Sequence, residues 1–218
     1  ASTSKLCDLK EGDSVLDFVG PLGLPSELCE MTDEELAQKR IVFVGGGLGA
    51  APIYPQVKYL AERGFKPDVI IGAKTKDIEI MRPELVAVSA NYYQATDDGS
   101  EGFHGMVTDC LKDLVQNQGK AYNHCVTIGP MIMMKFVAKL TQELGIFTIA
   151  SLNTLMVDGT GMCGACRVSV GGKMRFTCVE GPEFDAHQVN FDEALRRQVM
   201  YREVEKLRLE EYQNCKRN

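Results

Sequence analysis

The sequence predicts an α/β protein with a five-stranded, parallel, doubly wound sheet, a small cysteine-rich segment and a C-terminal helix. Three observations support this fold class. Short apolar runs typical of buried strands alternate with helical patterns between residues 36 and 150. A glycine-rich turn directly follows the first of these runs, and three cysteines lie close together between positions 163 and 178.

The composition is that of an ordinary globular protein. The chain has 218 residues, of which 44% are hydrophobic and 25% are charged, enough for one medium domain and a smaller one. Its net charge of −6 argues against nucleic acid as a partner, because an acidic protein releases no counterions from phosphates. The sequence has no apolar run long enough to cross a membrane and no signal peptide. We therefore expect a cytoplasmic protein, in which closely spaced cysteines indicate metal binding.

The N-terminal segment, residues 1–35, reads as the end of a β-structure. Polar and apolar residues alternate over 14–19, and a glycine–proline turn follows at 20–23. Because too few strands are present to close a unit, we expect residues before Ala1 to belong to a domain that has been cut away.

The next segment begins with a βαβ unit. A strand over 41–44 leads through the glycine turn into a helix that ends near Arg63 and Gly64, and a second strand covers 68–71. Further strands are expected at 86–89, 92–95, 124–128 and 146–149, with helices over 103–117 and 131–143. The last segment, 191–218, is expected to be one long, charge-rich helix.

The glycine turn matches the pattern G-x-G-x-x-A through Gly45, Gly47 and Ala50. Residues without a Cβ let backbone N–H groups approach a phosphate, and the helix dipole adds partial positive charge. A tight strand-to-helix turn without a ligand is the alternative. The candidate nucleotide-binding residues of this turn are Gly45, Gly46, Gly47, Gly49 and Pro52.

Other candidates follow later strands. Lys74 occupies the position after the second strand where dinucleotide sites often carry an acidic residue. Its side chain either binds the 2′-phosphate of NADP or is simply solvated. The sequence therefore does not decide between NAD and NADP. Asp97 and Asp98 either bond ribose hydroxyls or form an Asx turn. The pattern at 129–134 opens a helix where a pyrophosphate would lie, although methionines there are more often helix core. Its candidate residues are Gly129, Pro130 and Met131.

The cysteine cluster has the spacing D-x4-C-x2-C-x11-C. Plant-type two-iron two-sulfur proteins use C-x4-C-x2-C with a later cysteine, so an aspartate occupies the first ligand position here. A carboxylate carries the same charge as a thiolate but is a harder ligand. The alternative is a structural zinc site completed by an aspartate or by His187. The candidate metal ligands are Asp158, Cys163, Cys166 and Cys178.

Three motifs, VGGGLGAAP, TIGPMIMM and DGTGMCGACRV, occur in this order. Together they resemble the flavin- and pyridine-nucleotide-dependent electron-transfer subunits of the ferredoxin–NADP reductase type. Within that group the sequence is similar to the alpha subunit of NADH-dependent ferredoxin:NADP oxidoreductase, also called a sulfide dehydrogenase subunit, and to the electron-transfer subunit of dihydroorotate dehydrogenase. The resemblance covers nearly the whole chain. The dihydroorotate-type proteins carry four cysteines, so Asp158 favours the first group.

The resemblance implies a family layout of three parts, an FAD-binding β-barrel, an NAD(P) domain and a small cluster domain, and we divide this chain into four segments. These are the C-terminal remnant of an FAD-binding β-barrel (1–35), an NAD(P)-binding domain (36–150), a 2Fe-2S cluster domain (151–190) and a C-terminal helix (191–218). Ser2 and Thr3 match the family's turn near the flavin pyrophosphate, but the main flavin motif, R-x-Y-[ST], has no counterpart. The chain is thus expected to be a fragment. Ile128 also departs from the family, which usually has cysteine there.

The function implied is that of an oxidoreductase subunit. Electrons would pass from NADH or NADPH through FAD, held by the full-length protein, and the 2Fe-2S cluster to a larger partner subunit, with ferredoxin as a further partner. No catalytic acid or base is expected. The alternatives are a dihydroorotate dehydrogenase electron-transfer subunit and a non-enzymatic module, either redox-sensing or stabilised by a cluster or zinc.

Overall fold

The computed structural model describes residues 2–217. Its main feature is a seven-stranded sheet in the order β4-β3-β2-β1-β5-β6-β9. All neighbouring strands are parallel except β6 and β9, which are antiparallel. The strands are β1 (Ile41–Gly46), β2 (Asp68–Ala73), β3 (Asn91–Thr96), β4 (Phe103–His104), β5 (His124–Ile128), β6 (Phe147–Ser151) and β9 (Glu183–Asp185).

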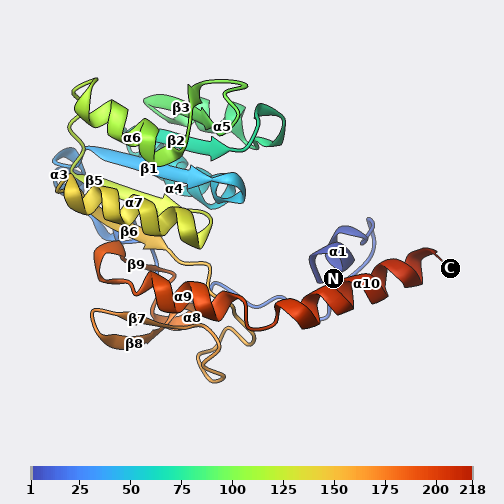
Figure 1. Cartoon of the computed structure of the whole chain (residues 1–218). Helices are drawn as coiled ribbons and strands as arrows, with labels where there is room; N and C mark the ends of the chain where they lie inside the picture. The colour runs from blue at the N-terminus through green and yellow to red at the C-terminus, as the bar shows by residue number, and fades with distance from the viewer. Residues whose placement is uncertain (1, 218) are drawn as a thin grey trace.

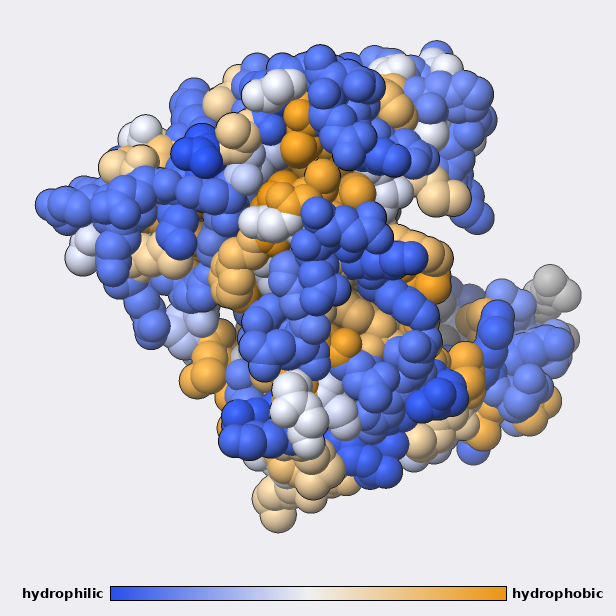
Figure 2. Space-filling model, turned by 60° about the vertical axis from the view of Figure 1, so that its left-hand side comes forward, coloured by the Kyte–Doolittle hydropathy of each residue, from blue (hydrophilic) through white to orange (hydrophobic). Residues whose placement is uncertain are grey.

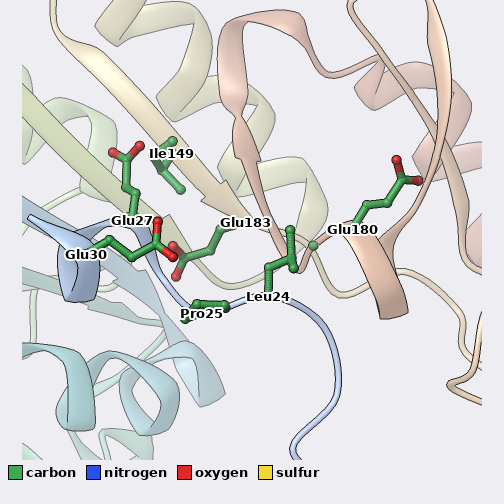
Figure 3. A pocket seen from close by; sticks show the side chains of 8 residues that line it. Leu24, Pro25, Glu27, Glu30, Ile149, Glu180 and Glu183 are labelled. Atoms are coloured by element: carbon green, nitrogen blue, oxygen red, sulfur yellow. The ribbon is translucent and has the colours of Figure 1, made fainter.

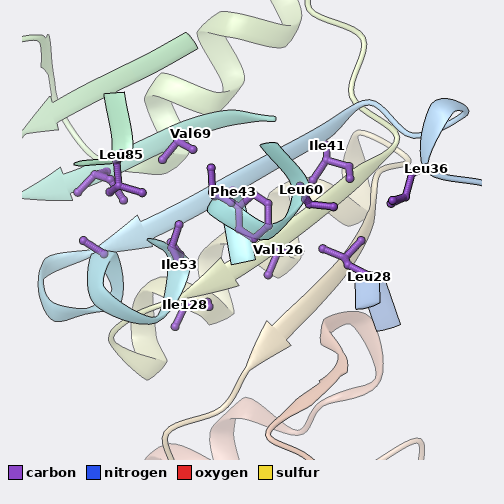
Figure 4. Close-up of a cluster of buried hydrophobic side chains, with 13 residues drawn as sticks. Leu28, Leu36, Ile41, Phe43, Ile53, Leu60, Val69, Leu85, Val126 and Ile128 are labelled. Atoms are coloured by element: carbon purple, nitrogen blue, oxygen red, sulfur yellow. The ribbon is translucent and has the colours of Figure 1, made fainter. Parts of the chain in front are cut away.

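Helices cover both faces of the sheet (Figure 1). One face packs against α2 (Glu27–Glu30), α3 (Asp33–Ala37), α4 (Ala50–Glu62) and α5 (Arg82–Val88); the other packs against α6 (Val107–Gln116) and α7 (Met131–Glu143). On the first face, Phe43 lies at the centre of a buried cluster that includes Leu60 and Val126 (Figure 4). Each such side chain contributes about 1.5–3 kcal/mol when fully buried. This packing fixes the strands whose ends carry the nucleotide candidates.

The order of the strands creates a switch point at β1. From β1 the chain adds β2, β3 and β4 on one side, then returns to place β5 and β6 on the other side. The connections after β1 and β5 therefore leave in opposite directions. In open α/β sheets, ligands bind in the crevice at the carboxyl ends of such a strand pair.

The cysteine-rich part contains little regular structure. A hairpin of β7 (Arg167–Val170) and β8 (Lys173–Phe176) turns through Gly171 and Gly172, both with positive φ. The short helix α8 (Thr177–Glu180) follows, and β9 then joins this part to the edge of the main sheet. The described residues also contain the 3₁₀ turns η1 (Gly47–Gly49), η2 (Lys76–Ile78) and η3 (Ala186–Gln188).

The two ends of the chain lie side by side. Tyr212 and Lys216 of α10 (Arg202–Arg217) both contact Asp8, which follows α1 (Ser2–Cys7). This pair projects from the body as a separate lobe (Figures 1 and 2). The helix α9 (Phe191–Gln198) precedes α10 and buries Phe191 and Ala194 against the body.

Several sequence expectations were wrong. The sheet has seven strands and not five, because the short β4 and the antiparallel β9 extend its two edges. Residues 86–89 do not form a strand: 86–88 end α5, which starts with a proline in its first turn and buries Leu85 in the core.

Two expectations for the ends of the chain were also wrong. Residues 14–19 pair with no strand among the described residues, and Leu16 and Phe18 are exposed. The tail is two helices, since α9 ends where packing on the body ends and α10 then leaves the surface.

Within the described residues, no helix combines the length and apolar character that spanning a membrane requires.

Candidate functional site

The glycine turn after β1 packs directly against the end of β5. A Cβ on Gly49 would lie 2.1 Å from the carbonyl oxygen of Ile128, and one on Gly46 would lie 2.5 Å from the sulfur of Met133. A Cβ on Gly129 would lie 2.9 Å from the backbone nitrogen of Gly46. The two turns at the switch point can therefore approach this closely only because these residues are glycines.

The helices that begin at these turns have no side-chain cap at their N-termini. The N-caps of α4 and α7 are Gly49 and Pro130, and neither makes a side-chain capping bond. Gly47, with a φ of 53°, has open space beside its Cα. Two uncapped helix N-termini next to a backbone that carries no side chains form a surface suited to a diphosphate.

The remaining residues of these two motifs differ in exposure. Pro52 is exposed in the first turn of α4. Met131 is buried in the hydrophobic cluster beneath α7, as the helix-core alternative predicts. Met133, which the sequence did not single out, packs against Gly46.

Lys74, Asp97 and Asp98 lie together at the carboxyl ends of β2 and β3. The N–H of Asp98 donates to the carbonyl of Lys74 at 3.3 Å, and that of Asp97 to the carbonyl of Ala73 at 3.1 Å. Asp98 accepts the N–H of Ser100, so it forms the Asx turn, and its hydrogen bonds to Ser100 lower its pKa. The side chains of Lys74 and Asp97 are exposed at this edge of the sheet.

Two residues that the sequence did not reveal hold this edge together. Arg82 forms an ion pair with Glu101, which joins the segment after β2 to the segment after β3. Thr96 donates to the carbonyl of Glu101 at 2.7 Å. Because Arg82 and Glu101 are far apart in sequence and are common surface residues, no local pattern marks them.

The four candidate metal ligands form two pairs. The sulfurs of Cys166 and Cys178 are 3.3 Å apart and both residues are buried. Asp158 accepts the N–H of Cys163 at 2.9 Å, and both residues are exposed. No group of three His, Cys, Asp or Glu residues between 2 and 217 converges on one ion position.

Hydrogen bonds and glycines shape the loop that carries the first pair. Asp158 also accepts the N–H of Thr160, and this bond is the main reason that its pKa is lowered. Gly159, Gly161 and Gly164 have φ values of 74°, 86° and 65°, which favour glycine. Burial chiefly raises the pKa of the Cys178 thiol, and hydrogen bonding to Cys166 raises it further.

This donor set fits a two-iron cluster better than a single zinc ion. Each iron of such a cluster takes two protein ligands. The structure pairs the thiols of Cys166 and Cys178 and, on the adjoining segment, holds the carboxylate of Asp158 against the backbone N–H of Cys163. A single zinc ion needs four ligands at one point. His187 does not complete a zinc site, because its Nε2 lies 3.1 Å from the hydroxyl of Thr141.

The backbone around Cys166 is held by side chains that the sequence analysis missed. Thr177 donates to the carbonyl of Cys166 at 3.0 Å, and Arg197 of α9 donates to the carbonyl of Ala165 at 3.1 Å. The position of Thr177 beside Cys178 is a local signal for such a role. Arg197 has no such signal, because it belongs to a charge-rich helix.

Ser2 and Thr3 lie apart from both sites. They line a surface hollow against Arg202 and Arg208 at the base of the projecting lobe. Their match to a flavin turn stays a prediction.

Comparisons with known proteins agree with this arrangement. Residues 153–190 match the family described as the iron-sulfur cluster binding domain of dihydroorotate dehydrogenase B. The chain is 44% identical over 211 residues to a dihydroorotate dehydrogenase B (NAD(+)) electron transfer subunit homolog of Thermotoga maritima, covering 97% of this chain and 71% of that protein. A probable electron transfer subunit of the same enzyme from Methanocaldococcus jannaschii is 33% identical, over 87% of this chain and 68% of the other.

A solved structure is similar over almost the same range. It is that of the NADH-dependent reduced ferredoxin-NADP oxidoreductase, described for flavin-based electron bifurcation. The TM-score is 0.83 at 43% identity, and the match covers 97% of this chain and 73% of the other.

Proposed function

Because this chain belongs to the family of electron-transfer subunits of the dihydroorotate dehydrogenase B type, we propose that it conducts electrons between a nicotinamide nucleotide and a partner subunit through a 2Fe-2S cluster. The observation that carries the proposal is the pairing of Asp158 with Cys163 and of Cys166 with Cys178 inside the segment that matches an iron-sulfur cluster binding domain. We assign residues 36–150 to the nucleotide and 151–190 to the cluster.

The nucleotide is assigned to the switch point of the sheet. Gly45, Gly46, Gly47 and Gly49 leave room for a diphosphate beside the N-termini of α4 and α7, where Gly129 and Pro130 also lie. Lys74 and Asp97 are placed to contact the ribose end, because they follow the two strands next to β1 on that side. The bound nucleotide supplies the hydride, and these residues bind and orient it.

The cluster is assigned to Asp158, Cys163, Cys166 and Cys178. When bound, it accepts and releases one electron at a time. The protein holds it between a buried thiol pair and an exposed carboxylate–thiol pair, so one side is shielded from water and the other faces outward. The exposed side is suited to electron exchange with a partner subunit.

FAD is proposed for the longer protein, following the flavin-based chemistry of the enzyme of known structure. Ser2 and Thr3 lie in the projecting lobe, where they line a surface hollow with residues of α10. We therefore derive no step through the flavin from this chain.

Of the two related enzyme types, we propose the ferredoxin:NADP oxidoreductase type. Sequence identity does not separate the two types, because the solved structure matches at 43% and the Thermotoga maritima protein named as a dihydroorotate dehydrogenase B electron transfer subunit homolog matches at 44%. The choice rests on the aspartate at position 158, where the resemblance gives the dihydroorotate type a cysteine. The larger partner subunit, and ferredoxin as a further partner, follow from this assignment. Assays of the reconstituted complex separate the two enzyme types: one measures activity with NADP⁺ and ferredoxin, and the other measures activity with dihydroorotate.

The first test is the visible absorption spectrum of anaerobically purified protein, with iron and zinc measured on the same sample. We expect a brown protein with about two irons per chain. A protein that holds zinc and cannot be reconstituted with iron and sulfide contradicts the proposal and favours a structural site.

A second test addresses the nucleotide. We expect titration with NADH or NADPH to saturate at or below millimolar concentration in the intact, flavin-loaded protein. Absence of binding there favours a redox-sensing subunit, which needs a cluster but no nucleotide.

A further inference from the structure

We propose that residues 22–24, here called the strap, position the iron–sulfur cluster by holding its two ligand-bearing segments together. This inference rests on the proposed function, since it assumes that the cluster binds at Asp158, Cys163, Cys166 and Cys178. The strap belongs to the N-terminal segment and lies more than a hundred residues from these ligands in sequence. It therefore acts on the cluster as a positioning element and not as a ligand.

The first contact joins the strap to the segment after Cys178. The N–H of Leu24 donates to the carbonyl of Gly181 at 2.7 Å. Gly23 has a φ of 80°, and a Cβ on it would lie 2.3 Å from the same carbonyl oxygen. The backbone of the strap can make this contact only with glycine at position 23.

The second contact joins the strap to the loop of Asp158. A Cβ on Gly159 would lie 2.8 Å from Cδ1 of Leu22, so the leucine side chain rests directly on the glycine after the proposed ligand. The strap thus touches the segment of Cys178 on one side and the loop of Asp158 and Cys163 on the other. These two segments carry proposed cluster ligands, and their relative positions must stay fixed for all four ligands to bind one cluster.

The surroundings make the strap the border of a pocket. Leu24 and Pro25 line a cavity of about 180 Å³ together with Glu180 and Glu183, and Figure 3 shows Leu24 between these two carboxylates.

A defined effect on the cluster follows. The relative positions of the four ligands govern how firmly the iron is held and what potential the cluster has. Displacing the strap should therefore loosen the iron and change the potential. Substituting residues that support the metal ligands typically lowers the affinity for the metal by about 10–100-fold.

The test compares three glycine-to-alanine variants of the full chain. Gly23→Ala creates the clash with Gly181. Gly20→Ala changes the same segment, but its Cβ has no atom within 4 Å. Gly12→Ala introduces the same kind of backbone strain, at a φ of 95°, again with no atom within 4 Å. We measure iron release to a chelator, the potential of the cluster and its electron paramagnetic resonance spectrum.

We expect Gly23→Ala to release iron about tenfold faster and to show a changed potential and spectrum, with both controls like the wild type. A milder variant guards against misfolding: Leu22→Ala should also release iron faster, whereas Leu22→Met, which keeps a long apolar side chain over Gly159, should behave like the wild type. If the cluster of Gly23→Ala and Leu22→Ala matches that of the controls, the strap proposal is wrong. If the wild type itself binds no two-iron cluster, the proposed function fails first.

Discussion

The carboxyl ends of the sheet strands and the cysteine loop are both candidate cofactor sites, but the protein builds them in different ways. The glycines of the first site follow β1 and β5, which are central strands with a neighbouring strand on each side. The loop from 153 to 166 has no helix or strand, and it is shaped by glycines and by hydrogen bonds to Asp158. Topology therefore preforms the candidate nucleotide site, whereas a bound group would have to complete the candidate cluster site.

The largest expected effect separates the two sites completely. Cys166→Ser should abolish the visible spectrum and nearly all bound iron, because it breaks the buried thiol pair. Binding of NADH should persist, since the sheet does not depend on the cluster. Cys29→Ser, a change at an exposed cysteine outside the cluster, is the control. Full iron occupancy in Cys166→Ser would show that the ligands are assigned wrongly.

The corresponding change at the candidate nucleotide site is Gly49→Ala, in the turn after β1. Its Cβ would meet the backbone oxygen of Ile128, so we expect a loss of nucleotide binding and about 3 kcal/mol of destabilisation. Denaturant unfolding and NADH titration measure the two effects.

The control for Gly49→Ala is Gly47→Ala, which has positive φ but open space and should destabilise by about 1–2 kcal/mol. Equal destabilisation by the two changes would mean that the contact between the turns does not matter.

A smaller effect concerns pH and the sheet alone. His124 is fully buried in β5, and burial lowers its pKa to about 4 from a usual value near 6.5. The unfolded chain therefore binds the proton more readily, so stability is lost as the pH falls from 6.5 towards 4.

We expect the free energy of unfolding to fall by about 2 kcal/mol between pH 7 and pH 5 through His124. Denaturant unfolding at both values measures this. Glu27 and Glu183, whose pKa values are raised chiefly by burial, act in the opposite direction. If the free energy of unfolding falls by the same amount between pH 7 and pH 5 in His124→Leu as in the wild type, His124 is not the cause.

The smallest effect should come from Asp158→Cys. A thiolate carries the same charge as the carboxylate, so the cluster should be retained with a shifted potential, and stability should change by about 0.5 kcal/mol or less. Redox titration of the cluster gives the result. Asp158→Ala, which removes the ligand and both loop hydrogen bonds, should lose iron. An unchanged spectrum and potential in Asp158→Cys would show that Asp158 is not a ligand.

Much of the sheet was predictable because strand and helix patterns are local. The turn between β1 and α4 was located from adjacent residues, and so was the start of α7 at Pro130. The prediction of a strand at 86–89 was wrong because a short apolar run fits a strand as well as a helix end. Pro83 and the packing of Leu85 decided in favour of the helix.

The sequence by itself determined which residues have the chemistry for each site. Glycines suited to a phosphate and thiols spaced for iron are properties of short segments, and a short segment fixes its own spacing. Only the tertiary structure decided which distant residues support them: the contact of Gly49 with Ile128, of Arg197 with Ala165 and of the strap with Gly181. Such contacts depend on the packing of the whole core, which brings together distant segments. The local sequence of neither segment predicts the contact.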